Sequence, residues 1–235
     1  MRKVGPVRSA TVGAAGILLA AALIGSAATA NTGAHGDDWQ VLTFPGIDPS
    51  QFVLGSDGRI DVLAENSSAL LYRMVTPAEG EQPFLRWRWR VDQTMPSTDL
   101  SRKGADDRPL AVHLWFPVPE ERLSFWDRMT DALRADLLDA PLTGYVLTYV
   151  WGGKRTRGQK MLNPYIGDRG VMIILRDGGT PTGRWFDEKI DYARDFEMAF
   201  GFRPPSPSHI ALSGDADDTW SRSAGTVARL AFAGD

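Results

Sequence analysis

Three acidic residues in the second half of the chain could carry acid–base chemistry: Glu188, Asp191 and Asp195. Glycosidases use two carboxyl groups, one protonated and one ionised, roughly 5–10 Å apart. Glu188 and Asp191 are therefore the candidate acid and base of a hydrolase. The favoured alternative is structural, with Asp191 stabilising the start of a helix and Glu188 paired on the sheet with Arg86, Arg88 or Arg184.

A second group of carboxylates, in one short loop, could bind a metal ion: Asp215, Asp217 and Asp218. Calcium prefers about six to eight oxygen ligands, and such a loop supplies the first few. An EF-hand is excluded, because Thr226 stands where that motif ends in a glutamate. A calcium site and simple Asx turns both remain open, and no other cofactor is expected.

Three of the eight tryptophans lie near the ends of predicted strands, beside glycine, arginine or aspartate: Trp151, Trp185 and Trp220. Sugar rings stack on exposed indole rings, while arginines and carboxylates bond their hydroxyls. These three residues, together with Arg184, are the predicted ligand-binding residues. Burial in the core is the alternative for each tryptophan.

The loop Gly152–Lys160 concentrates four cations and three glycines. Such a composition fits a mobile loop that contacts a phosphate or an acidic sugar. Its spacing is not that of a Walker loop, and a solvated basic loop is the usual interpretation.

Several kinds of chemistry are excluded or disfavoured by composition. Without cysteine the chain has no disulfide, no thiol nucleophile and no cysteine-ligated metal. It also lacks the HExxH and GxSxG motifs, and His113 and His209 lie within apolar strands as expected core or surface residues. A formal net charge of −3 argues against nucleic acid as a partner.

Short runs of strand-forming residues must position these groups, and turn residues separate the runs. The clearest is Phe84–Val91, in which apolar residues alternate with arginines. This pattern is typical of a β-sandwich or barrel. The predicted strands are Trp39–Phe44, Ala69–Val75, Phe84–Val91, Leu110–Phe116, Gly144–Trp151, Val171–Leu175, Arg184–Ile190, His209–Leu212 and Val227–Phe232.

Two segments have helical rather than strand-like spacing. In Glu120–Leu138 apolar residues recur every three or four positions, which predicts an inserted amphipathic helix. Asp191–Phe200 predicts a shorter helix that ends at Gly201. We therefore expect a mainly β protein, an antiparallel β-sandwich with one inserted helix and one short helix.

The first 30 residues have the composition of a secretory signal peptide. A basic head, an uncharged apolar stretch and the small residues Ala28-Thr29-Ala30 follow one another. We expect cleavage there, a flexible lead-in over 31–38 and one domain over 39–235, in the periplasm or outside the cell. An uncleaved membrane anchor is the alternative, because the stretch is just long enough to span a bilayer. After cleavage no membrane span is expected.

The order of several short motifs resembles the bacterial family known as domain of unknown function number 3047, over about Leu70 to Phe232. The motifs are Arg86-Trp87-Arg88-Trp89, Asp106-Asp107, Tyr149-Val150-Trp151-Gly152, Gly183-Arg184-Trp185 with Glu188, Asp191-Tyr192, Phe200-Gly201 and Asp215-Ala216-Asp217-Asp218-Thr219. Ser213-Gly214 and Lys189 depart from the family pattern. The resemblance implies no assigned reaction, and the fold is similar to galactose-binding-like jelly rolls only at the level of architecture.

The sequence thus leads to one main hypothesis and two alternatives. The main one is an exported, non-catalytic β-sandwich of an uncharacterised family that binds a glycan or similar polar ligand in the cell envelope. The first alternative is a hydrolase acting on envelope polysaccharide through Glu188 and Asp191. The second is an interaction module in which Glu120–Leu138 docks a protein partner. Whether the protein is an enzyme stays open at this stage.

Overall fold

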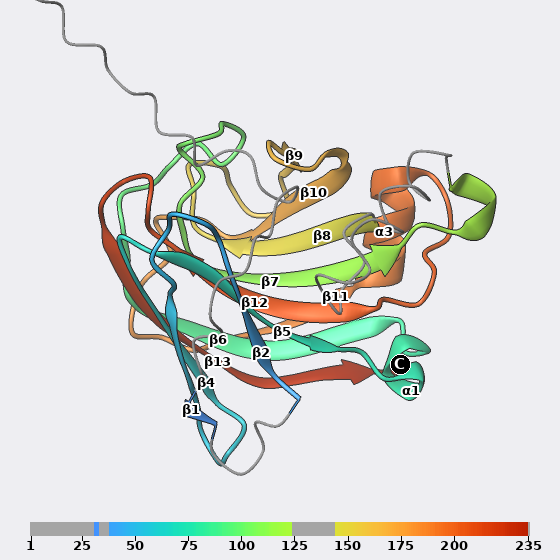
Figure 1. The fold of residues 1–235 in the computed structure, drawn as a ribbon, viewed down its shortest axis with the longest axis horizontal. Coiled ribbons are helices and arrows are strands. Elements are labelled where there is room, and N and C mark those ends of the chain that lie inside the picture. The colour runs from blue at the N-terminus through green and yellow to red at the C-terminus, as the bar shows by residue number, and fades with distance from the viewer. Residues whose placement is uncertain (1–30, 33–37, 124–143, 235) are drawn as a thin grey trace, which may run out of the picture.

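Two β-sheets pack face to face in the computed structural model, which describes residues 31–32, 38–123 and 144–234 (Figure 1). In sheet A the strand order is β1 (Asn31–Thr32), β3 (Gln51–Leu54), β4 (Ile60–Glu65), β13 (Arg222–Ala233), β6 (Phe84–Gln93) and β11 (Phe186–Asp191). In sheet B it is β2 (Gln40–Thr43), β5 (Ser68–Met74), β12 (His209–Asp215), β7 (Arg108–Pro117), β8 (Gly144–Trp151), β10 (Gly167–Arg176) and β9 (Lys160–Asn163). The predicted mainly β sandwich is confirmed.

Most neighbouring strands run antiparallel, as predicted, but β1 and β3 pair in parallel, and so do β8 and β10. Strand β9 lies between them in the chain and takes the sheet edge next to β10, so that the chain returns to the same direction. Four short strands of two to six residues were not predicted: β1, which lies in the expected lead-in, and β3, β4 and β9.

The core lies between the two sheets and is rich in aromatic rings. Strand β6 alternates as predicted, with Trp87 and Trp89 buried and the intervening arginines on the outer face. The Trp87 ring lies 5.9 Å from that of Tyr149 in the opposite sheet, measured between centroids. Such tilted contacts between large rings stabilise the interface of the sheets beyond simple area burial.

Helix α3 (Tyr192–Phe200) confirms the predicted short helix. Asp191 caps it by accepting a hydrogen bond from the Arg194 backbone N–H, and Gly201 ends it in the left-handed region at φ +78°. A further short helix, α1 (Pro77–Gly80), carries a capping box formed by Thr76 and Glu79.

Two predictions concern residues outside the described part of the chain. The leader over 1–30 lies outside it altogether. Of the predicted helix Glu120–Leu138 only the beginning is described, and there a single 3-10 turn, η1 (Glu120–Arg122), precedes Leu123. Among the helices of the described residues, none is long and apolar enough to cross a membrane.

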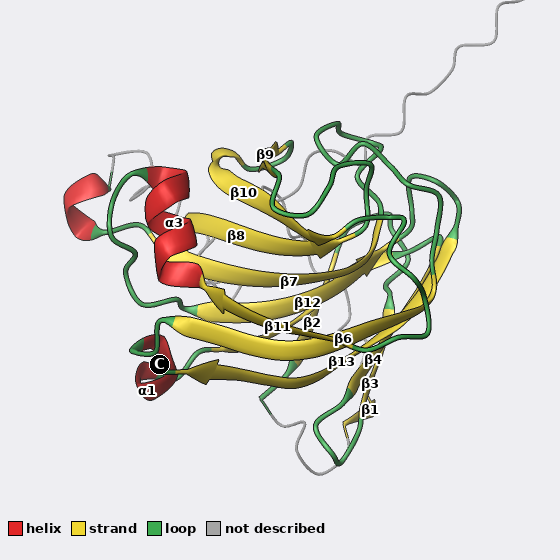
Figure 2. Cartoon of the chain, turned by 180° about the vertical axis from the view of Figure 1, so that it is seen from behind, coloured by secondary structure: helices red, strands yellow, loops and turns green. Residues whose placement is uncertain are grey.

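The loops that carry the candidate residues gather at one end of the sandwich, which we call the loop end, and the helices lie at the other (Figure 2). The loops are 94–107, 152–159, 177–185 and 216–221. Strand register explains this, because Leu110 near the start of β7 pairs with Trp151 at the end of β8, and Asp215 at the end of β12 pairs with Arg108. Side chains distant in sequence therefore meet there.

Candidate functional site

The loop end holds a cluster of carboxylates, which we call the acid cluster: Asp106, Asp107, Asp215, Asp217 and Asp218. One carboxylate oxygen from each of Asp107, Asp215 and Asp217 lies within 4.8 Å of the other two. Asp107 and Asp215 are buried. Three oxygens at this spacing could coordinate one divalent cation. The group contains Asp215 and Asp217 of the predicted metal ligands, adds Asp107 from another loop and does not include Asp218.

Asp107 also shapes the loop that follows β12. Its carboxylate accepts hydrogen bonds from the backbone N–H groups of Asp218, at 3.2 Å, and Thr219, at 2.8 Å. An aspartate from the β6–β7 connection thus holds the β12–β13 loop, and these long-range bonds are not the local Asx turns of the alternative. These bonds fix Asp217 and Asp218 beside Asp107 and Asp215.

The acid cluster carries far more negative than positive charge. Among the described residues, Arg108 forms ion pairs with the cluster, with its Nη1 at 3.1 Å from Asp215 and 3.2 Å from Asp106. Burial raises the pKa of Asp215 well above its ordinary value, and hydrogen bonding and repulsion from Asp217 raise it further. Burial and the charge of Asp217 raise the pKa of Asp218 to about 7. A bound proton or a cation would relieve this repulsion.

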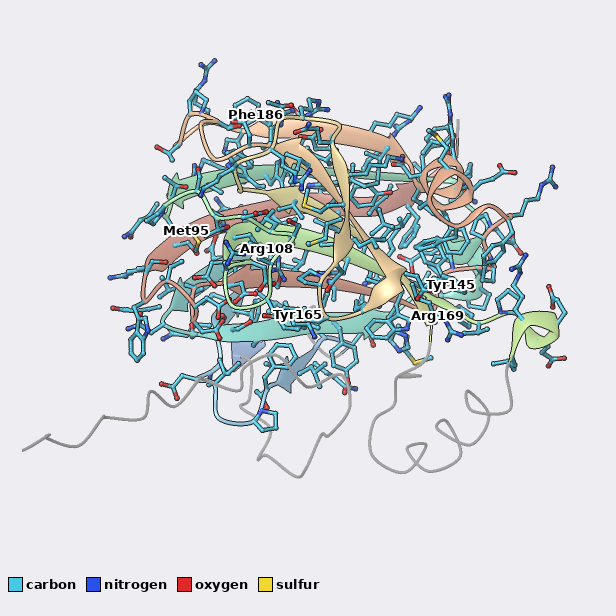
Figure 3. All side chains as sticks on the ribbon, turned by 90° about the horizontal axis from the view of Figure 1, so that it is seen from above. Met95, Arg108, Tyr145, Tyr165, Arg169 and Phe186 are labelled. Carbon is cyan, nitrogen blue, oxygen red and sulfur yellow. The ribbon has the colours of Figure 1, made fainter. Side chains whose placement is uncertain are left out.

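Figure 3 labels Arg108, the ion-pair partner of the cluster, which lies with Met95 toward one end of the molecule, whereas Tyr145 and Arg169 lie toward the other. Tyr165, from the turn between β9 and β10, joins the cluster by donating a hydrogen bond from its hydroxyl to Asp106 at 2.9 Å. The Gly104 N–H donates to the same hydroxyl at 3.0 Å. Three separate connections of the chain are thus tied together around the carboxylates.

The three predicted tryptophans have different environments. Trp151 is only 1% exposed, and its ring packs against Trp89 and Phe186 between the sheets. The prediction that it forms part of an exposed ligand platform is therefore wrong. Its strand β8 is apolar on both faces, so alternation alone did not reveal which face meets the other sheet.

Trp220, by contrast, is 81% exposed and follows the acid cluster directly in the chain. Its backbone lies in the left-handed region at φ +50°, which is uncommon for a bulky residue. Trp185 is partly buried, with the guanidinium groups of Arg88 and Arg90 4.9 Å and 5.0 Å from its ring centroid. Arg184 beside it is exposed. Among the predicted tryptophans, Trp220 offers the most open ring.

The carboxylates considered for hydrolysis have structural partners. Glu188 is buried on β11 and accepts hydrogen bonds from Trp89 Nε1 at 3.1 Å, Arg176 Nε at 2.7 Å and Arg157 Nη2 at 3.1 Å. Asp191 caps helix α3. Asp195 pairs with Lys160 at 3.0 Å. Asp191 thus has the expected structural role, whereas Glu188 pairs with Arg157 and Arg176 rather than with the expected Arg86, Arg88 or Arg184.

His113 is a buried, hydrogen-bonded histidine, as expected. Nδ1 lies 3.1 Å from Thr148 Oγ1, and Nε2 lies 2.9 Å from Ser213 Oγ. Burial, with a contribution from the charge of Arg108, lowers the pKa of His113 to about 3. The imidazole is therefore neutral at physiological pH and serves to satisfy the two hydroxyls.

The sequence analysis did not select Asp106 and Asp107 as site residues, although it quoted them among the family motifs. The sequence does contain a feature that marks them: two consecutive acids directly precede β7, a strand that is mostly apolar. Their place beside Asp215 depends on the pairing of β7 with β12, which the sequence does not specify.

Comparisons with known proteins give a family and a distant likeness to solved structures. A model of the family described as "Protein of unknown function (DUF3047)" matches residues 37–231. The chain is also similar to the solved structure of the xyloglucanase domain of NopAA, a type three effector from Sinorhizobium fredii, in complex with cellobiose. Identity is 7%, with 85% of this chain and 95% of that chain covered and a TM-score of 0.42, too low to carry an argument. No curated protein matches.

Proposed function

Since the chain belongs to the family described as "Protein of unknown function (DUF3047)", we propose that it is a non-catalytic β-sandwich that binds a hydroxyl-rich ligand, such as a glycan, through a calcium ion at the loop end. The composition of the first 30 residues supports export to the periplasm or beyond. A glycan of the cell envelope would be accessible in that compartment.

The acid cluster is the observation that carries this proposal. Asp107, Asp215 and Asp217 present oxygens within 4.8 Å of one another, from loops that are held together by hydrogen bonds. Calcium accepts carboxylate ligands and completes its coordination with waters or with hydroxyls of a ligand. These three aspartates would hold the ion, and the ion would supply a positive centre to which sugar hydroxyls bind.

Trp220 supports a sugar as the ligand. Its indole ring is 81% exposed and lies three residues after Asp217, so a ligand on the ion would be close to an open aromatic surface. Aromatic rings bind the apolar faces of sugars, and a single exposed tryptophan gains little stability by its position. Trp185 and Arg184 at the same end are further candidate contacts.

Calcium titration of the purified protein, after treatment with a chelator, tests the first part of the proposal. We expect one binding event by calorimetry, which is lost in the double variant Asp215→Asn, Asp217→Asn. Asp187→Asn is the matched control, because Asp187 is an exposed carboxylate on the outer face of sheet A. Absence of calcium binding to the wild type would refute the proposed ion site.

A glycan array probed with and without calcium tests the second part. We expect binding that depends on calcium and is weakened at least tenfold by Trp220→Ala, with the fold unchanged. Calcium binding without recognition of any glycan would reject the ligand class and keep only the ion site.

A further inference from the structure

We infer that the ligand of the loop end is anionic, and specifically a polysaccharide that carries carboxylate groups. This inference rests on the proposed function and names the ligand class of the same site. It comes from a set of exposed cations on two loops of the loop end, which we call the basic rim: Arg102, Lys103, Lys154 and Arg155.

The two loops that form the basic rim lie side by side. The Lys154 backbone N–H donates a hydrogen bond to the Thr98 carbonyl at 3.0 Å. A side-chain carbon added at Gly153 would come within 2.7 Å of Leu100 Cδ1, so the loops touch without space between them. Cations that are far apart in sequence are therefore collected on one surface.

The basic rim borders the acid cluster directly. Gly104, next to Lys103, lies close to Asp218: a β-carbon added to this glycine would be 3.9 Å from Asp218 Oδ1. The Asp106 backbone N–H also approaches Asp218 Oδ2, at 3.4 Å. The connection that carries Arg102 and Lys103 therefore lies against the acid cluster, and the loop that carries Lys154 and Arg155 is hydrogen-bonded to the same connection.

Most of the basic rim is not engaged by the rest of the described structure. Arg102, Lys154 and Arg155 form no side-chain hydrogen bond or ion pair within the described residues. The charges of the two arginines do contribute to lowering the pKa of Asp99. Lys103 lies over the Tyr165 ring at 5.5 Å. Arg157 of the same loop is different, because it is bound to Glu188. The free guanidinium and ammonium groups remain available to a ligand.

This arrangement of charge selects among ligands. A neutral glycan would gain nothing from the basic rim. A nucleic acid, with one charge for about every 1.7 Å of duplex, would place many phosphates close to the acid cluster. A polysaccharide with one carboxylate per sugar has sparser charge: its hydroxyls can reach the calcium ion while its carboxylates meet arginine in paired hydrogen bonds.

The test compares a short oligogalacturonide with a cello-oligosaccharide of equal length, by calorimetry in calcium buffer. We expect the acidic chain to bind at least tenfold more tightly. Arg155→Glu with Lys154→Glu should weaken its binding at least tenfold and reduce the dependence on salt, while calcium titration stays unchanged. Arg194→Glu is the control, because Arg194 is an exposed cation on helix α3 at the opposite end.

The outcomes separate this inference from the proposed function. Calcium binding with equal or better affinity for the neutral chain would overturn the inference alone. An oligonucleotide that binds as tightly as the acidic chain would overturn the choice of carboxylate. Loss of calcium binding, with acidic binding that still depends on Arg155, would reject the proposed ion and support the anionic ligand.

Discussion

At the scale of single residues, environment rather than residue type determines what each side chain can do. Trp151 and Trp220 are the same amino acid, yet one is 1% exposed and the other 81% exposed. Glu188 and Asp215 are both buried acids, but Glu188 is bonded to two arginines, whereas Asp215 shares a single arginine with Asp106. The charge of Glu188 is offset by its two partners, whereas burial and the neighbouring carboxylates raise the pKa of Asp215 well above its ordinary value.

The contrast between the two tryptophans gives a direct prediction. Trp151→Ala should lower the free energy of unfolding by about 3–5 kcal/mol, because it empties a large volume between the sheets. Trp220→Ala should change it by less than about 0.5 kcal/mol. Urea unfolding measures both, and equal losses in the two variants would contradict the burial described here.

Glu188→Gln should lower the free energy of unfolding by about 2–3 kcal/mol. This loss is at or below the lower end of the range for breaking a buried ion pair, because Arg157 is partly exposed and water can hydrate it in the variant. Asp191→Asn should cost only a few tenths of a kcal/mol, since asparagine also caps helices. Urea unfolding again provides the measurement. A stable Glu188→Gln protein that has lost hydrolysis of a polysaccharide would instead favour the catalytic alternative.

His113 should make stability depend on pH in the acid range. Its pKa is lowered to about 3 in the folded protein, from an ordinary value of 6.5, so the unfolded state binds the proton more readily between these values. The contribution of His113 to the free energy of unfolding is therefore complete above pH 6.5. It decreases by about 1.4 kcal/mol per pH unit as the pH falls below that value.

Comparison with His113→Gln isolates this effect, because aspartates such as Asp215, whose pKa is raised, act in the opposite direction in both proteins. Urea unfolding between pH 7 and pH 4.5 should show a smaller loss of stability in the variant. Parallel pH profiles of the two proteins would disprove the assignment.

At the scale of elements, close contacts between loops hold the candidate site together. Loop 152–159 is tied to the β6–β7 connection through Thr98 and to loop 177–185 through the hydrogen bond from Gly178 N–H to the Gly153 carbonyl. Gly153 lies in the left-handed region, at φ +79°, with Leu100 against its α-carbon. Glycine is needed there both for its backbone conformation and for its lack of a side chain.

Gly153→Ala and Gly158→Ala separate these two requirements. Both positions have positive φ, so each alanine should cost roughly 1–2 kcal/mol. Only at Gly153 does the new carbon meet another side chain, which should add about 1–3 kcal/mol. Denaturant unfolding gives the difference, and equal costs would show that the loops are less closely packed than described.

At the scale of the whole molecule, the two ends of the sandwich differ in structure. Its core is aromatic, its helices lie at one end, and its charged loops lie at the other (Figure 2). A ligand that binds at the loop end bridges the β6–β7 and β12–β13 connections, which belong to strands in both sheets. Binding there should therefore stabilise the entire domain rather than one loop.

Calcium at about a hundred times its dissociation constant should add roughly 2.7 kcal/mol to the free energy of unfolding. For a protein of this size that corresponds to an increase of about 5–10 °C in Tm. Thermal unfolding monitored by circular dichroism, with chelator and then with calcium, measures it. The same increase in Asp215→Asn, Asp217→Asn would show that the ion binds elsewhere.

Local sequence determined much of the fold. The alternation in Phe84–Val91 correctly identified the buried and exposed faces of β6, and the residues Asp191 and Gly201 correctly marked the ends of α3. Strand β4 also alternates, with Ile60 and Val62 buried and Asp61 exposed, but its polar residues hid the pattern. These features depend on neighbours in the chain, so they can be recognised from the sequence.

The candidate site was decided by tertiary structure. Asp107 meets Asp215 only because β7 pairs antiparallel with β12 in the register that sets Arg108 opposite Asp215. Trp151 is buried because one face of β8 meets the opposite sheet, although both faces are apolar. Composition supplied the aspartates and tryptophans; pairing between distant strands, which local spacing does not encode, determined which of them come together and which remain exposed.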